Sequence, residues 1–137
     1  MGQLDAATPN SVYGRKMLVV MSDLFFSAAI SDGAKKLGLG IQFVQDRAVA
    51  LERINAGPAL VIFDLNCAPA DPIGLIRSLK ADPATAGIPT IGFVSHVQTE
   101  LRQRAVESGC DVVVARSVFA QNLMSILQSS GVVAHEP

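Results

Sequence analysis

Short apolar runs alternate with amphipathic stretches along most of the chain. The runs have the length of strands, and the continuous apolar character of several of them suits strands that are buried on both faces of a sheet. The five expected strands are Met17–Met21, Ile41–Val44, Ala59–Phe63, Thr90–Val94 and Asp111–Ala115. The stretches that separate and follow these runs are long enough, and polar enough on one side, to predict a helix after each strand.

The helical stretches also carry start and stop signals. Between Phe26 and Leu37, apolar side chains recur about one helical turn apart, and Gly38 suits the left-handed backbone that often ends a helix. Asp and Ser side chains stand where later helices should begin, and such side chains cap free backbone N–H groups. The expected caps are Asp46, Asp71 (before Pro72) and Ser117, and the fourth helix is expected over Gln98–Ser108.

Strict alternation of strand and helix predicts a parallel sheet with helices on both faces. A closed eight-stranded barrel needs roughly 200 residues or more, whereas this chain has 137. We therefore expect a (βα)5 α/β fold, a doubly wound, flavodoxin-like, five-stranded parallel sheet with strand order 2-1-3-4-5. One domain should cover residues 17–130, between mobile tails at 1–16 and 131–137. Ligands of such sheets bind at the carboxyl ends of the strands.

Composition and charge narrow the function. Half of the residues are hydrophobic, and the net charge is −1, so the chain lacks the basic excess that nucleic-acid binding requires. No apolar run approaches the roughly 20 residues of a membrane span, and residues 1–16 contain no apolar core of a signal peptide. The two cysteines match no metal-binding spacing. We expect a cytoplasmic protein that binds neither nucleic acid nor membrane.

Polar residues gather at the predicted strand ends. Asp23 follows the first strand closely, Asp64 and Asn66 follow the third, Ser95 follows the fourth, and Arg116 follows the fifth. In the predicted fold these turns lie side by side on one rim of the sheet, which is where chemistry should be sought.

Three segments carry a resemblance to a known family. An apolar strand leads into Asp64 and Asn66; Leu79-Lys80-Ala81-Asp82 is followed by Ile88-Pro89; and Glu107-Ser108-Gly109-Cys110-Asp111 leads into the fifth strand. In order and spacing, these segments resemble a response-regulator receiver domain of the single-domain chemotaxis-regulator kind. The resemblance runs from Met17 to Arg116.

The resemblance implies a role for each residue at the rim. Asp64 would accept a phosphoryl group, and Ser95 and Arg116 would contact it. Mg²⁺ would be held by Asp64, by the backbone carbonyl of Asn66 and by Asp23. The implied partner is a sensor histidine kinase or another signalling protein. The resemblance also implies a homodimer through the Gln98–Gln128 face, which contains the fourth helix, fifth strand and fifth helix.

The chain departs from this pattern where the metal would bind. Met21 and Ser22 stand where the resemblance implies paired acids, and Asp23 comes one residue late, where it could instead be a first-turn anion of the helix. Thioethers are poor ligands for Mg²⁺. Val94 stands at the usual hydroxyl position, and Arg116 replaces a lysine. We therefore expect weak Mg²⁺ binding and an ion pair between Asp64 and Arg116.

The interpretation that follows is a pseudo-receiver, not an enzyme, that signals through protein contacts with weak or absent phosphorylation of Asp64. Two alternatives stay open. A conventional phospho-accepting regulator would complete a weak metal site with Asp23 or Ser22 and water. A flavodoxin-like domain would instead bind an unrelated small ligand.

Overall fold

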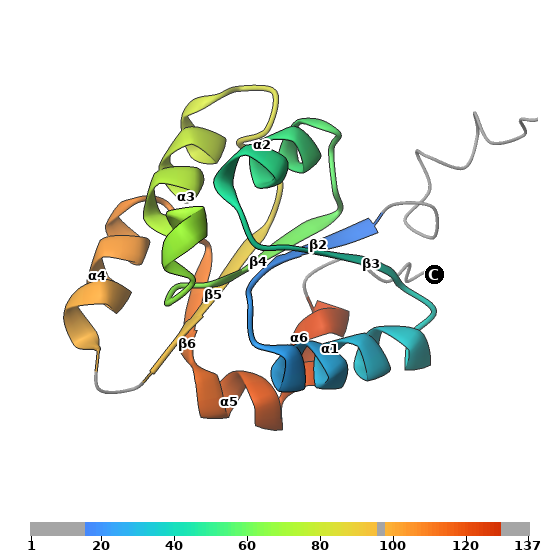
Figure 1. The fold of residues 1–137 in the computed structure, drawn as a ribbon. Coiled ribbons are helices and arrows are strands. Elements are labelled where there is room, and N and C mark those ends of the chain that lie inside the picture. The colour runs from blue at the N-terminus through green and yellow to red at the C-terminus, as the bar shows by residue number, and fades with distance from the viewer. Residues whose placement is uncertain (1–15, 96–97, 130–137) are drawn as a thin grey trace, which may run out of the picture.

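A computed structural model describes residues 16–95 and 98–129 and shows a twisted parallel sheet between two layers of helices (Figure 1). The sheet has five strands in the order β3-β2-β4-β5-β6, all paired in parallel. In chain order this is 2-1-3-4-5, so the predicted topology is confirmed. The strands are β2 (Lys16–Val20), β3 (Gly40–Val44), β4 (Leu60–Asp64), β5 (Thr90–Val94) and β6 (Val112–Ala115).

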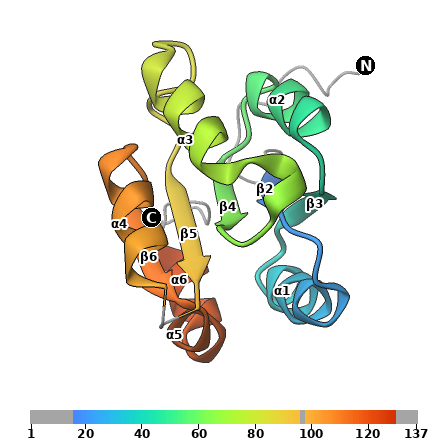
Figure 2. The same ribbon diagram turned by 60° about the vertical axis from the view of Figure 1, so that its left-hand side comes forward.

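Two hydrophobic layers hold the helices against the sheet, and Figure 2 shows helices on either side of the strands. Alternate residues of a strand point to opposite faces, so Leu18 and Val20 of β2 join one core cluster while Met17 and Val19 join the other. The first cluster packs under α2 (Arg47–Asn55), α3 (Pro72–Ala81) and α4 (Thr99–Glu107); the second packs under α1 (Leu24–Lys36), α5 (Arg116–Gln121) and α6 (Leu123–Ser129). A short 3-10 helix, η2 (Ala68–Ala70), precedes α3.

Aspartate caps begin the first three helices. The carboxylate of Asp23 accepts the Phe26 N–H at 3.0 Å, and that of Asp46 accepts the Val49 N–H at the same distance. Asp71 accepts the Gly74 N–H and adopts a left-handed backbone conformation, with φ of 51°. The predicted caps at Asp46 and Asp71 are confirmed.

The last helix differs from its prediction. It begins at Arg116 directly after β6, and no side chain caps it, so the predicted cap at Ser117 is wrong. It is also divided into α5 and α6 at Asn122. The Asn122 N–H and its side-chain amide both donate to the Val118 carbonyl, while the Asn122 carbonyl accepts the Ile126 N–H. One asparagine therefore ends one helix and begins the next.

A polar network ties together the amino ends of β5 and β6, opposite the rim. The Lys80 ammonium donates to the carbonyls of Ala86 and Ile88 and to the Asp111 carboxylate. The same carboxylate oxygen accepts the backbone N–H and the hydroxyl of Thr90. Two of the three segments that carry the family resemblance contain Lys80, Ile88 and Asp111, so these two segments contribute to the amino end of the sheet rather than to the rim.

The described residues, 16–95 and 98–129, include most of the domain predicted at 17–130. Lys16, expected in the N-terminal tail, is the first residue of β2. The rest of that tail and the C-terminal tail at 131–137 lie outside the described residues. Within the described part of the chain, no helix is long and apolar enough to cross a membrane.

Candidate functional site

The strand register brings the predicted site residues to one edge of the sheet. Asp64 at the end of β4 pairs with Phe93 of β5, which in turn pairs with Val114 of β6. β5 therefore delivers Ser95, and β6 delivers Arg116, beside the end of β4. Asp23 follows the end of β2, the other neighbour of β4. The convergence expected from the sequence is confirmed.

Asp64 is buried at this rim, with only 5% of its surface exposed. Its Oδ1 accepts the backbone N–H of Asn66 at 2.9 Å. Burial raises the pKa of the Asp64 carboxyl, because removing a carboxylate from water disfavours its charged form; the Asn66 hydrogen bond and the Arg116 charge oppose this shift, and the Asp23 charge adds to it.

Arg116 binds a different carboxylate from the one expected. Its guanidinium forms an ion pair and hydrogen bond with Asp23 Oδ2, and the described residues form no ion pair between Asp64 and Arg116. The expected Asp64–Arg116 ion pair is therefore wrong. Both oxygens of Asp23 therefore have partners, because Oδ2 binds Arg116 and Oδ1 caps α1. The Phe26 N–H and then the Arg116 side chain lower the pKa of the Asp23 carboxyl.

Aromatic rings explain why Arg116 takes this position. The guanidinium carbon lies 4.4 Å from the centre of the Phe26 ring and 5.8 Å from that of Phe93. Phe93 stacks on Phe119 at 5.1 Å, and Phe26 meets both rings edge-on. Cation–π attraction therefore adds to the ion pair. Sequence reasoning placed Phe26 on the inner stripe of its helix but did not connect it with Arg116.

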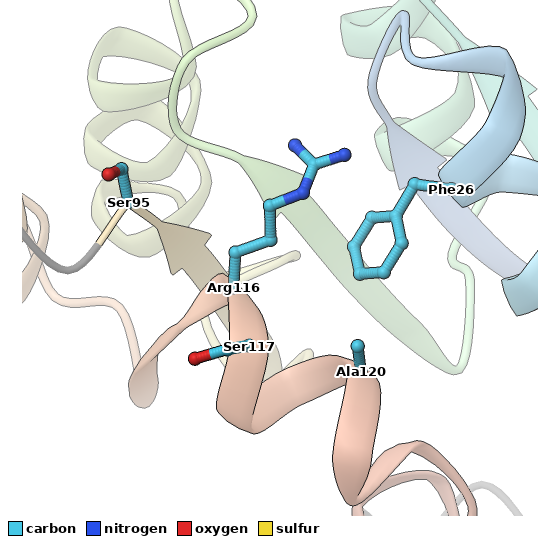
Figure 3. A pocket seen from close by; sticks show the side chains of 5 residues that line it. All are labelled: Phe26, Ser95, Arg116, Ser117 and Ala120. Carbon is cyan, nitrogen blue, oxygen red and sulfur yellow. The ribbon is translucent and has the colours of Figure 1, made fainter.

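A surface cavity of about 340 Å³ opens beside the Arg116 side chain (Figure 3). It is lined by Phe26, Ser95, Arg116, Ser117 and Ala120. Ser95 follows β5 without a bulge, since Val94 pairs regularly with Ala115 and is buried. Ser95 and Arg116 thus border one cavity, and their contact with a phosphoryl group stays a prediction.

Asn66 connects the turn that follows β4 with the start of α4. Its side-chain amide donates to Gln98 Oε1 at 2.7 Å, while its backbone N–H binds Asp64. Gln98 occupies the N-cap position of α4 but makes no side-chain cap there. The Gln98 side chain therefore links the start of α4 to the loop that holds Asp64.

The residues at the rim do not fit Mg²⁺ in this arrangement. Both oxygens of Asp23 are already committed, one to the α1 cap and one to Arg116. Met21 is buried and has no oxygen in its side chain, whereas Mg²⁺ needs oxygen ligands in near-octahedral geometry. Across residues 16–95 and 98–129, no three His, Cys, Asp or Glu side chains form a group that could hold a metal ion.

Comparison with known proteins identifies the fold. No protein-family model matches the sequence, and no curated protein matches it. Solved structures do match. A response regulator from Hahella chejuensis is 20% identical, with 90% of this chain and 99% of that chain covered and a TM-score of 0.78. A putative response regulator from Chloroflexus aurantiacus is 17% identical, with coverages of 85% and 96% and a TM-score of 0.75.

A third match is the receiver domain of a sensor histidine kinase from Pseudomonas aeruginosa, in which a magnesium ion is coordinated in the active-site cleft. It is 18% identical, covers 84% of this chain and 95% of that chain, and has a TM-score of 0.73. At these identities the comparisons establish the fold, so this chain has the fold of response-regulator receiver domains. The resemblance drawn from the sequence is confirmed at that level.

Proposed function

We propose that this protein is a receiver-type signalling module, without catalytic activity of its own, in which Asp64 is phosphorylated weakly or not at all. One observation carries the proposal: the Asp23 carboxylate, the acid nearest to the end of the first strand, is bound by Arg116. Phosphoryl transfer relies on a metal ion to neutralise developing charge. A carboxylate already bound to a guanidinium is a poor ligand for such an ion.

Output would then come from protein contacts. On the Gln98–Gln128 face, Val106, Val112 and Val118 expose 55%, 44% and 42% of their surfaces. Exposed apolar side chains mark an interaction surface where they form one patch. These three valines are the apolar contacts that the expected homodimer, a sensor histidine kinase or another signalling protein would use on this face. A cytoplasmic location, and the absence of nucleic-acid and membrane binding, stay predictions.

A conventional phospho-accepting regulator is the second candidate, because Asp64 keeps the position that such a function needs. It ends a strand at the rim, its Oδ1 is held by a backbone N–H, and Arg116 lies near enough to affect its pKa. These features would orient an acceptor carboxylate, although they do not supply a metal ion.

The two candidates differ in what acetyl phosphate does. We expect a phosphoryl-sized gain in intact mass in at most a minor fraction of the folded protein when it is incubated with acetyl phosphate over a wide range of Mg²⁺ concentrations. Asp64→Asn is the matched control, since it removes the acceptor and keeps the side chain's shape. A gain in most of the protein that is absent from Asp64→Asn would establish efficient phosphorylation of Asp64 and overturn the proposed function.

A further inference from the structure

We infer that Arg116 is the resident cation of the rim pocket, and that it keeps divalent metal ions from a latent site formed by Asp23 and Asp64. The inference rests on the proposed function, because it gives a cause for the missing metal chemistry. It also goes beyond that function: it predicts that removing a single positive side chain gives the protein a metal affinity that it otherwise lacks.

The contacts of Asp23 show why the guanidinium excludes a metal ion. Of the two carboxylate oxygens, Oδ1 is used by the α1 cap, so only Oδ2 could reach a metal ion, and Arg116 occupies that oxygen. The Asp23 side chain is 32% exposed and that of Arg116 is 40% exposed, so the pair lies between the buried core and open water. A divalent ion approaching Oδ2 would meet the positive charge of Arg116 at close range, where like charges repel strongly.

The surroundings of Arg116 hold it in this position. A long cationic side chain loses rotamer freedom when it is fixed, and for exposed pairs this loss usually cancels the gain. Here the Phe26 ring lies against the guanidinium, with Phe93 further away. Phe93 and Phe119 are fully buried and fix the position of the Phe26 ring. The packed rings thus orient Arg116 toward Asp23. An arginine on an open surface would have no such support.

The oxygens released by removing Arg116 suit a small divalent ion. Asp23 Oδ2 would lose its partner, and Asp64 carries a second oxygen, Oδ2, beyond the Oδ1 that accepts the Asn66 N–H. Asp64 ends β4 and Asp23 follows β2, which is paired with β4, so the two carboxylates stand at the ends of adjacent strands. One or two carboxylates together with water are the usual protein contribution to a magnesium site.

Equilibrium binding of Mn²⁺, measured by calorimetry without any phosphoryl donor, tests the inference. Mn²⁺ takes the same oxygen ligands as Mg²⁺ and generally binds protein sites with higher affinity than Mg²⁺ does. We expect no saturable binding by the wild-type protein at millimolar Mn²⁺, and one saturable site in Arg116→Gln with a Kd at least about tenfold below that concentration range. Arg104→Gln, on the exposed surface of α4, is the matched control and should behave like the wild type.

The double variant Arg116→Gln with Asp23→Asn identifies the ligand, and it should lose the acquired site. Equal Mn²⁺ binding by the wild type and Arg116→Gln would overturn the inference, as would no binding by an Arg116→Gln protein whose circular dichroism is native. So would a site that survives the Asp23→Asn change. Because no phosphoryl donor is present, these results do not depend on whether Asp64 accepts a phosphoryl group, so the proposed function and this inference fail separately.

Discussion

Two ion pairs lie at opposite ends of the sheet and differ in the groups that surround them. Lys80 and Asp111 meet at the amino ends of β5 and β6, with Lys80 Nζ 2.9 Å from Asp111 Oδ2, and the Lys80 side chain is 17% exposed. Arg116 and Asp23 meet at the carboxyl rim. Each pair joins one cation to one aspartate from distant parts of the chain, but the partners that surround the two pairs are of different kinds.

The amino-end pair is embedded in backbone hydrogen bonds. Lys80 binds two carbonyls of the loop after α3, and Asp111 binds the first backbone N–H of β5 through Thr90. Each of these bonds fixes a chain segment. The rim pair instead contacts aromatic rings and one helix cap. We therefore expect that breaking the amino-end network destabilises the protein more than exchanging a residue of the rim pair does.

The largest effect should follow from breaking the amino-end network. Asp111→Ala removes one of the acceptors of Lys80 and the acceptor of both Thr90 donors. A hydrogen bond to a charged group contributes about 1.5–3 kcal/mol net of its exchange with water. Because the Asp111 side chain is 49% exposed, we expect the lower end, a loss of about 2 kcal/mol in the free energy of unfolding by urea.

Asp32→Ala is the control for this prediction. It breaks the Asp32–Lys36 pair on α1, in which both side chains are 66% exposed, and should cost less than about 0.5 kcal/mol. Similar losses in the two variants would show that the network at Asp111 is no more than a surface ion pair.

The sequence could predict those features that depend on local contacts or on the sheet topology. Continuous apolar runs determine buried strands through burial alone, and an Asp before a helix caps it through contacts three residues away, so the topology and the caps at Asp46 and Asp71 followed from local pattern. The convergence of Asp23, Asp64 and Arg116 followed from the topology. In each of these cases the deciding contacts are short in sequence or are imposed by the parallel sheet.

The partner of Arg116 could not be predicted in this way. Its side chain is long enough to approach either Asp23 or Asp64, and the choice depends on the position of the Phe26 ring, which is known only once α1 packs on β5. The division of the last helix at Asn122 could not be predicted either, because a single asparagine both ends α5 and begins α6. Ser117 lies nearby and is a more common type of N-cap residue.

A smaller effect should separate the two functions of Asp23. Serine keeps a cap oxygen but has no charge for Arg116, whereas alanine loses both. We expect Asp23→Ser to destabilise only slightly, because the ion pair is partly exposed and screened, and Asp23→Ala to destabilise more, because it also loses the cap. Urea unfolding at low and high salt measures both, and only the ion-pair part should weaken with salt.

Asp46 provides the matched comparison, because it caps α2 without an arginine partner among the ion pairs of residues 16–95 and 98–129. Asp46→Ser should be nearly neutral and Asp46→Ala should cost about 1 kcal/mol. If Asp23→Ser proved as neutral as Asp46→Ser, the Asp23–Arg116 pair would add nothing to stability, and its function would lie in the pocket alone.

The smallest expected effect is that of Asp64→Asn, which should stabilise the protein, whereas the variants above should destabilise it. Burial raises the pKa of the Asp64 carboxyl above its ordinary 3.8, so the folded state favours the protonated form. The contribution of this group to stability is therefore fully present below pH 3.8 and is lost as the pH rises through the raised pKa. Asp64→Asn removes the titration while keeping an oxygen for the Asn66 N–H. It should be neutral in acid and stabilise by up to about 1 kcal/mol at pH 7.

The amino end should show the reverse trend over the same pH range. The pKa of Asp111 is lowered: its hydrogen bonds with Lys80 and Thr90 outweigh its desolvation. Its stabilisation is present above pH 3.8 and is lost as the pH falls through the lowered pKa. Urea unfolding of Asp64→Asn and Asp111→Ala from pH 3 to pH 8, each compared with the wild type, should give differences that grow with pH in opposite directions. An Asp64→Asn variant that became less stable than the wild type toward neutral pH would mean that Arg116 holds the ionised Asp64, and the contrast between the two ends would then rest on the Asp111 network alone.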